Sequence, residues 1–231
     1  MKALLYKEFK LAMHPICYVF IASFPFMMLI PGYPIAIGFI YILSCYPILF
    51  LGANKGQQSN DLLYSTLLPV RKKDIVLARI CTVAIMQFAF IALSACLLPL
   101  AFLFQNMMVA GASDAPDVMK NIAHAGFDLP SFVLVVAIVL VGFAIADLIF
   151  FPIYYKKGKS IVMSTLFTIL GFVIYLGLFT IGLPYMIGAE KANAVPLWIQ
   201  FIALAGSLII YIIIHLFVYK ISAKRLEKVD F

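Results

Sequence analysis

Few residues of this chain could do chemistry, and most of them stand alone in apolar surroundings. Asp147 is the one acidic residue inside a long apolar run. An ionised carboxylate at the centre of a bilayer costs about 2.5 to 3.5 kcal/mol on insertion scales. Asp147 could contact a transported molecule or carry a proton; equally, it could bind a partner inside a helix bundle or extend towards basic residues at the membrane surface. Nearby Gly142 and Ala146 would allow close packing of the same helix.

The remaining polar residues of the apolar runs do not assemble a hydrolase. Ser207 and His215 are eight positions apart on one run, which in a helix is about 12 Å by rise and beyond hydrogen-bond reach. An aspartyl protease would need a second membrane-embedded acid beside Asp147. His215 could titrate near neutral pH, or it could be a hydrogen-bonded histidine at the inner end of a span. His14, His124 and His215 share no metal-ligand spacing, so we expect no metal site.

Cofactor and nucleotide motifs are also incomplete. The cysteines form no C-x-x-C pair that would suit zinc or dithiol chemistry. Gly158-Lys159-Ser160 ends like a phosphate-binding loop, but Ile153 occupies the position where that motif needs its first glycine. We therefore expect no cofactor on this chain and no ATP site. The four cysteines all lie in apolar runs: Cys17, Cys45, Cys81 and Cys96.

The composition identifies the environment of these residues. Hydrophobic residues make up 65% of the 231 positions, charged residues only 12%, and the mean hydropathy is +1.09. Charged residues supply about 25% of an ordinary soluble domain. The composition therefore excludes a soluble enzyme and a disordered protein. It predicts an all-α membrane protein, residues 1–231 forming one transmembrane domain with about six spanning helices.

Apolar runs place these spans along the chain. A turn signal, Pro31-Gly32-Tyr33-Pro34, separates the first two runs. No A-x-A-like cleavage site follows the first run, so it is interpreted as a retained span and not as a signal peptide. Residues 105–130 form the longest predicted outer loop. The predicted spans cover residues 16–30, 35–53, 75–104, 131–155, 160–188 and 195–219.

Basic residues lie almost wholly on one side of this topology. Of the 17 Lys and Arg residues, only Lys120 and Lys191 fall on the other side. The positive-inside rule therefore predicts a multi-pass protein of the cell membrane with both termini in the cytoplasm. The net charge of +7 is interpreted as a basic collar at the cytoplasmic face, attracted to anionic headgroups, and not as a nucleic-acid-binding surface.

The cytoplasmic loop between the second and third spans contains a short apolar helix. Asn60 or Asp61 could cap its start, and Pro69 would end it. Leucines outside the membrane need a cover. The helix could lie on lipid headgroups or insert into a groove of a cytoplasmic partner, and both interpretations remain open. The residues of this segment are Asp61, Leu62, Leu63, Tyr64, Leu67, Leu68, Pro69 and Arg71.

The N-terminal residues 1–14 predict an amphipathic helix lying along the inner membrane surface. Apolar side chains recur there at helical spacing, while lysines occupy the other face. We expect an anchoring role, with His14-Pro15 turning the chain into the first span. The apolar positions are Leu4, Leu5, Phe9 and Met13, and the lysines are Lys2, Lys7 and Lys10.

Three segments carry a resemblance to a known family. The run Leu67-Leu68-Pro69-Val70-Arg71-Lys72-Lys73-Asp74-Ile75-Val76-Leu77-Ala78-Arg79 resembles the entry to the third helix of type-2 ATP-binding-cassette (ABC) permeases. The opening Tyr6-Lys7-Glu8-Phe9-Lys10 and the stretch Phe151-Pro152-Ile153-Tyr154-Tyr155-Lys156 are similar to small bacterial members, including the permeases of phenol-soluble modulin exporters.

This resemblance implies a permease half that pairs with a second permease, identical or not, and with two ATPase subunits that bind ATP and Mg²⁺. It implies that the N-terminal helix is an elbow helix and that residues 61–68 are a coupling helix docked in the ATPase. The branch suggests export of amphipathic, membrane-active peptides.

Other transport classes stay open beside this interpretation. One is a secondary carrier driven by protons through Asp147, although such carriers often contain internal repeats and none is recognisable here. The other is an ABC permease for immunity, multidrug or lipid export.

Overall fold

The computed structural model describes residues 2–12, 15–26, 65, 69–111, 129–157, 161–178 and 195–228. Within these ranges every regular element is a helix, as expected from the composition. The helices are α1 (Lys2–Lys7), the π-helical turn η1 (Glu8–Ala12), α2 (Pro15–Phe26), α5 (Lys72–Gly111), α7 (Leu129–Lys157), α8 (Ile161–Gly177) and α11 (Leu197–Glu227).

In the described part of the chain, three helices are long and apolar enough to cross a membrane, over Lys72–Phe104, Phe132–Lys156 and Leu197–Glu227. They coincide with the third, fourth and sixth predicted spans. A shorter apolar helix covers Met163–Tyr175, inside the fifth predicted span. The chain is thus an all-α membrane protein with several apolar helices. The second predicted span, residues 35–53, lies outside the described residues.

The helix ends differ from the predicted span ends because helical hydrogen bonding continues beyond the apolar runs. α5 runs to Gly111, seven residues into the predicted outer loop 105–130. α11 continues from Tyr219 to Glu227 through a basic last turn, since Lys and Arg are good helix formers. His215 lies inside α11, one turn before Tyr219, where the last predicted span ends.

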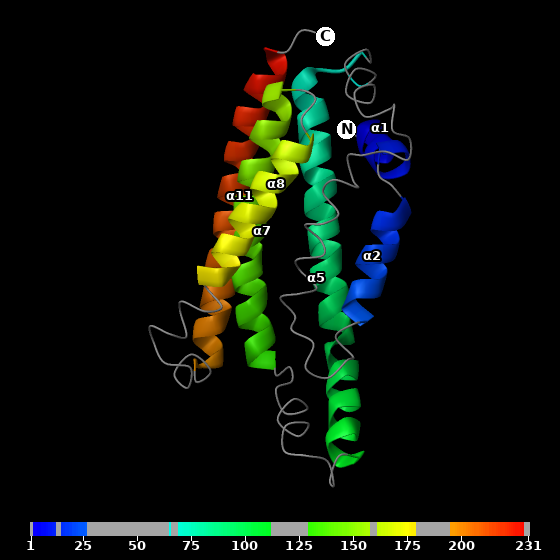
Figure 1. Ribbon diagram of the computed structural model, residues 1–231, viewed down its shortest axis with the longest axis vertical. Helices are drawn as coiled ribbons and strands as arrows, with labels where there is room; N and C mark the ends of the chain where they lie inside the picture. The colour runs from blue at the N-terminus through cyan, green and yellow to red at the C-terminus, as the bar shows by residue number, and fades with distance from the viewer. Residues whose placement is uncertain are drawn as a thin grey trace.

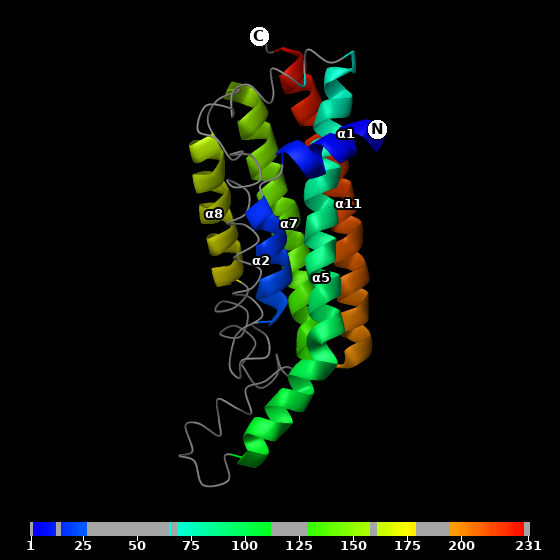
Figure 2. The same cartoon turned by 90° about the vertical axis from the view of Figure 1, so that its right-hand side faces the viewer.

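The helices form an elongated bundle with α1 and the end of α11 towards the same pole (Figure 1). α7 and α11 run side by side in the same direction, while α5 and α8 run the opposite way (Figures 1 and 2). α1 lies across the upper part of α5 and not along it (Figure 2). α5 bends in its lower part, where Pro99 interrupts its hydrogen-bond ladder (Figure 2).

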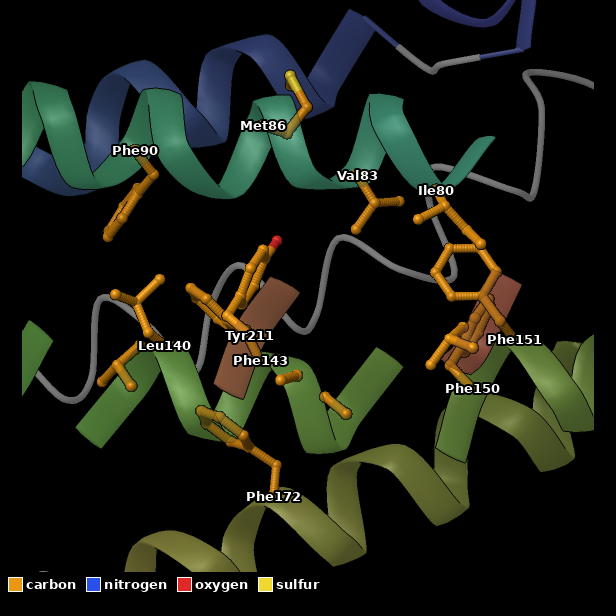
Figure 3. Packing of buried hydrophobic residues seen from close by; sticks show 14 of the residues in the cluster. Ile80, Val83, Met86, Phe90, Leu140, Phe143, Phe150, Phe151, Phe172 and Tyr211 are labelled. Atoms are coloured by element: carbon orange, nitrogen blue, oxygen red, sulfur yellow. The ribbon is translucent and has the colours of Figure 1, made fainter. Parts of the chain in front are cut away.

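α7 is the central helix of the bundle. In its most apolar stretch 61% of the residues are buried, against 17% in α11, so α11 leaves most of its surface for other contacts. Helices that are apolar all round belong in such central positions. Figure 3 shows side chains from α5, α7, α8 and α11 meeting in one core. The labelled members are Ile80, Val83, Met86, Phe90, Leu140, Phe143, Phe150, Phe151, Phe172 and Tyr211.

Small residues bring α7 and α8 together. A Cβ added at Gly142 would lie 2.6 Å from the Phe172 ring, and one added at Gly171 would lie 2.6 Å from Ile149. Ala146, the other small residue expected to allow close packing, is fully buried. Tyr175 adds a hydrogen bond of 3.0 Å from its hydroxyl to the carbonyl oxygen of Ile138. Close approach of this kind drives helix association in lipid, where hydrophobic burial alone contributes little.

Candidate functional site

Asp147 lies at the meeting point of three helices. Its side chain has no exposed surface. The Nε2 atom of His215 on α11 is 2.9 Å from its Oδ2 atom, and Nε2 of Gln87 on α5 donates to the same oxygen at 3.2 Å. The acid therefore has partners on two other helices of the bundle.

Gln87 and Tyr211 extend this network. The Tyr211 hydroxyl donates to Oε1 of Gln87 at 2.5 Å, so both polar ends of that amide are hydrogen-bonded. The Tyr211 ring also stacks on the His215 imidazole, with centroids 4.0 Å apart, which fixes the orientation of the imidazole. We call Gln87, Asp147, Tyr211 and His215 the inner polar cluster. It joins α5, α7 and α11 through side chains alone.

A second cluster lies nearer the pole that holds the N-terminus. Arg79 on α5 donates from Nε to Oε2 of Glu8 at 2.9 Å and from Nη2 to Oε1 of Glu8 at 3.3 Å. Its Nη1 donates to the hydroxyl of Tyr154 on α7 at 3.1 Å. Arg79 and Glu8 are 2% and 4% exposed, so this forked pair is largely desolvated. We call Glu8, Arg79 and Tyr154 the elbow cluster.

The elbow cluster joins the N-terminal helix to the rest of the chain. The Nζ atom of Lys7 lies 3.8 Å from Oε1 of Glu8, and the same ammonium donates to the hydroxyl of Ser65. Residues 61–68 are predicted to be a coupling helix. Of these the structure describes only Ser65, which is fully buried. The end of α11 is tied separately to α7, where Arg225 donates to the carbonyl of Pro152.

The predicted coupling segment is only partly described. Pro69 and Arg71 are exposed and precede α5, and the amide of Asp74 donates to the Arg71 carbonyl at 2.9 Å, closing a turn at the start of that helix. The other residues predicted for this site lie outside the described part of the chain: Asp61, Leu62, Leu63, Tyr64, Leu67 and Leu68.

Sequence reasoning missed most members of the two clusters. Arg79 stands seven residues inside α5, and a charge at such a position in an apolar run was a usable signal. Glu8 gave a weaker signal as an acid within a basic, amphipathic helix. Gln87, Tyr154 and Tyr211 gave none, since uncharged polar and aromatic residues are common in spans.

No other chemistry is assembled in the described ranges. They contain no group of three or more His, Cys, Asp or Glu residues that could hold a metal ion. Ser207 donates its hydroxyl to the Leu204 carbonyl of its own helix at 2.8 Å and is not paired with His215. The described side chains do build polar connections between apolar helices.

A family model described as ABC-2 family transporter protein matches residues 3–224. The chain belongs to the ABC-2 transporter family. It is therefore the membrane component of an ABC-2 type transporter, a non-catalytic subunit of a kind that generally pairs with ATPase subunits. Searches of curated proteins and of solved structures found no significant match. Both polar clusters lie within the part of this ABC-2 protein that the family model covers.

Proposed function

We propose that this ABC-2 protein is the permease subunit of an ATP-driven exporter of amphipathic, membrane-active peptides. The observation that carries the proposal is the family match over residues 3–224. The peptide cargo rests on the resemblance to permeases of phenol-soluble modulin exporters at residues 6–10, 67–79 and 151–156. ATP and Mg²⁺ would bind to a separate ATPase, and a second permease copy or homologue would complete the transporter.

The proposed topology has about six spans with both termini in the cytoplasm, in a bacterial plasma membrane. The arrangement of charge supports it. The start of α5, the end of α7 and the end of α11 lie at the pole that also holds α1 (Figure 1). These ends carry basic residues that would meet a cytoplasmic headgroup layer. They include Lys72, Lys73, Lys156, Lys220, Lys224 and Lys228.

We further propose that residues 61–71 dock on the ATPase and that the elbow helix braces this segment. Two contacts support the bracing: Lys7 binds Ser65, and Glu8 binds Arg79. A movement imposed on residues 61–71 would then reach α5 directly and α7 through Tyr154. Such rigid-body movement of packed helices is how domains usually transmit a switch.

Asp147 is proposed as the polar site of the bundle on which transport depends. It ties α7 to α11 and α5, and these helices must hold their arrangement while the permease halves move. Replacement Asp147→Asn should reduce transport without preventing assembly with the ATPase.

The test begins with the tagged full chain, isolated from its native membranes with its companions. We expect an ABC ATPase to co-purify and a labelled synthetic amphipathic peptide to enter phosphatidylethanolamine–phosphatidylglycerol vesicles only with ATP outside. Leu63→Asp and Leu67→Asp should lower ATPase recovery and transport, because a carboxylate cannot enter an apolar groove without losing hydration. Lys224→Glu adds a carboxylate at the same pole on exposed α11 and should change neither. Transport without an ATPase would refute the proposal.

A further inference from the structure

The position of one proton in the inner polar cluster follows from its hydrogen-bond geometry. The Nδ1 atom of His215 is 2.8 Å from the backbone carbonyl oxygen of Tyr211. A carbonyl oxygen can only accept, so Nδ1 must carry a hydrogen. The protonation state of the imidazole is therefore decided at Nε2, the atom that faces Asp147.

The contact between Nε2 and Asp147 requires one hydrogen between two atoms. If Asp147 is ionised, its Oδ2 only accepts, so Nε2 must donate and His215 is an imidazolium. If Nε2 lacks a hydrogen, it only accepts, so Oδ2 must be protonated and donate. In both cases one proton lies between Nε2 and Oδ2, which are 2.9 Å apart, and the pair has no net charge.

The other two possible states are unfavourable in this place. Removing the proton would set the lone pair of Nε2 against a carboxylate oxygen 2.9 Å away. Adding a second proton would give a net positive charge to a pair that is 0% and 11% exposed. Both states are disfavoured in a low-dielectric interior.

Neighbouring groups on α5 and α11 add no proton of their own to this count. From α5 these include the neutral amide of Gln87 and the thiol of Cys81, which acts electrostatically on Tyr211. From α11 they include the Tyr211 hydroxyl, which donates to Gln87. These groups are uncharged in their ordinary forms at neutral pH, with pKa values of about 8.5 for Cys and 10 for Tyr.

We propose that Asp147 and His215 hold a single shared proton and act as a net-neutral tie between α7 and α11. Gln87 and Tyr211 are positioning residues: Gln87 hydrogen-bonds Asp147 from α5, and the Tyr211 ring stacks on the His215 imidazole. This proposal concerns the folded chain alone and is tested without ATPase or cargo.

Proton counting gives each variant a distinct signature in reversible unfolding. The unfolded chain has ordinary pKa values of about 3.9 for Asp and 6.5 for His, so between about pH 4.5 and 6 it holds one proton on these two groups. The folded pair also holds one. Stability therefore does not change with pH in this window on account of the pair. Above about pH 7 the unfolded histidine is neutral, and the pair's contribution falls as pH rises.

The single variants have opposite slopes in the same window. In His215→Gln we expect the folding constant to fall as pH rises, because the unfolded chain ionises Asp147 in water while the folded chain would have to ionise it in the bundle interior. In Asp147→Asn we expect the folding constant to rise with pH, because only the unfolded chain protonates His215 in water. The double variant loses both titrations and serves as the reference for every other group in the chain.

The experiment is unfolding of the purified full chain in mixed detergent micelles from pH 4.5 to 8, each curve compared with the Asp147→Asn/His215→Gln double variant. Gln87→Leu is the matched control, since it removes a neighbour but no titrating group and should keep the wild-type slopes. The difference in free energy of unfolding between the wild type and the double variant should stay constant up to about pH 6 and fall above pH 7 if the pair holds a single proton. If this difference rises with pH below pH 6, the folded pair holds no proton; if it falls there, the pair holds two. Either result overturns the proposal. If one single variant does not fold, the wild type and the double variant still decide.

Discussion

Two buried charged pairs in the described part of the chain differ in how their charge is held. Glu8 and Arg79 form a forked ion pair, in which a guanidinium that stays protonated in proteins donates to both oxygens of the carboxylate. Asp147 and His215 are proposed to share one proton, which leaves their pair without net charge. The first pair holds fixed charges, and the second needs only one proton.

The distance of each pair from the basic pole of the bundle accounts for this difference. Arg79 and Gln87 mark the two clusters on α5 and are separated by about 12 Å of helical rise. The elbow cluster is nearer the basic pole, where Lys7 also approaches Glu8. The inner polar cluster lies farther along apolar α5, where fixed charges cost more. In this protein the pair nearer the basic pole is an ion pair, and the pair farther from it is the one proposed to be net-neutral.

The two clusters also connect different parts of the bundle. The elbow cluster joins the N-terminal helix to α5, with one hydrogen bond to α7. The inner polar cluster joins α7 to α11, with Gln87 reaching in from α5. Side-chain polar contacts therefore link α5 to α7 at two depths. The following substitutions separate what each link contributes.

The largest effect is expected from Arg79→Met. It leaves the Glu8 carboxylate buried without its forked partner, which should lower the free energy of unfolding by about 3 to 5 kcal/mol. Adding Glu8→Gln removes the carboxylate, which would otherwise have only the more distant Lys7 ammonium at 3.8 Å, and should recover most of that loss. Unfolding in mixed micelles measures both. A double variant as unstable as Arg79→Met would show that packing, and not charge, accounts for the loss.

Gln87→Leu should have the next largest effect. The Tyr211 hydroxyl loses its acceptor and Asp147 loses one donor, while the Asp147–His215 contact remains. We expect a loss of about 2 kcal/mol in the free energy of unfolding, the cost of leaving buried polar groups unsatisfied. Tyr211→Phe made on the Gln87→Leu background should then cost little more. A second loss as large as the first would mean that Tyr211 acts through another contact.

Tyr154→Phe is expected to be milder. It removes the 3.1 Å hydrogen bond from Arg79 but leaves both bonds from Arg79 to Glu8 and the stacking on Phe150. The free energy of unfolding should fall by about 1 kcal/mol. In transport assays the same variant weakens the link from α5 to α7. Loss of stability similar to that of Arg79→Met would instead make Tyr154 essential to the ion pair.

Lys10→Ala should have the smallest effect. Its ammonium donates to the Tyr6 hydroxyl at 2.7 Å, but both side chains are exposed on the N-terminal helix. Exposed substitutions of this kind change stability by less than about 0.5 kcal/mol. A larger loss in vesicles of anionic lipid than in neutral detergent would indicate that Lys10 holds the elbow helix to headgroups.

The sequence predicted the parts of the fold that depend on local composition. Long apolar runs indicate where helices cross lipid, so α5, α7 and α11 lie where spans were expected. Their ends were less predictable, since Gly111 and Glu227 lie beyond the apolar runs in segments that remain helical. Docking of residues 61–64 and 67–68 on an ATPase stays a prediction, because these residues lie outside the described part of the chain.

What the sequence by itself determined is that this is a helical membrane protein, that Asp147 is exceptional in it, and that no nucleotide motif accompanies it. These properties follow from residue type and neighbours along the chain. Only the tertiary structure decided that Asp147 meets His215 and Gln87, and that Arg79 meets Glu8. The partners are 60 to 71 positions apart, and helix packing alone sets which faces approach.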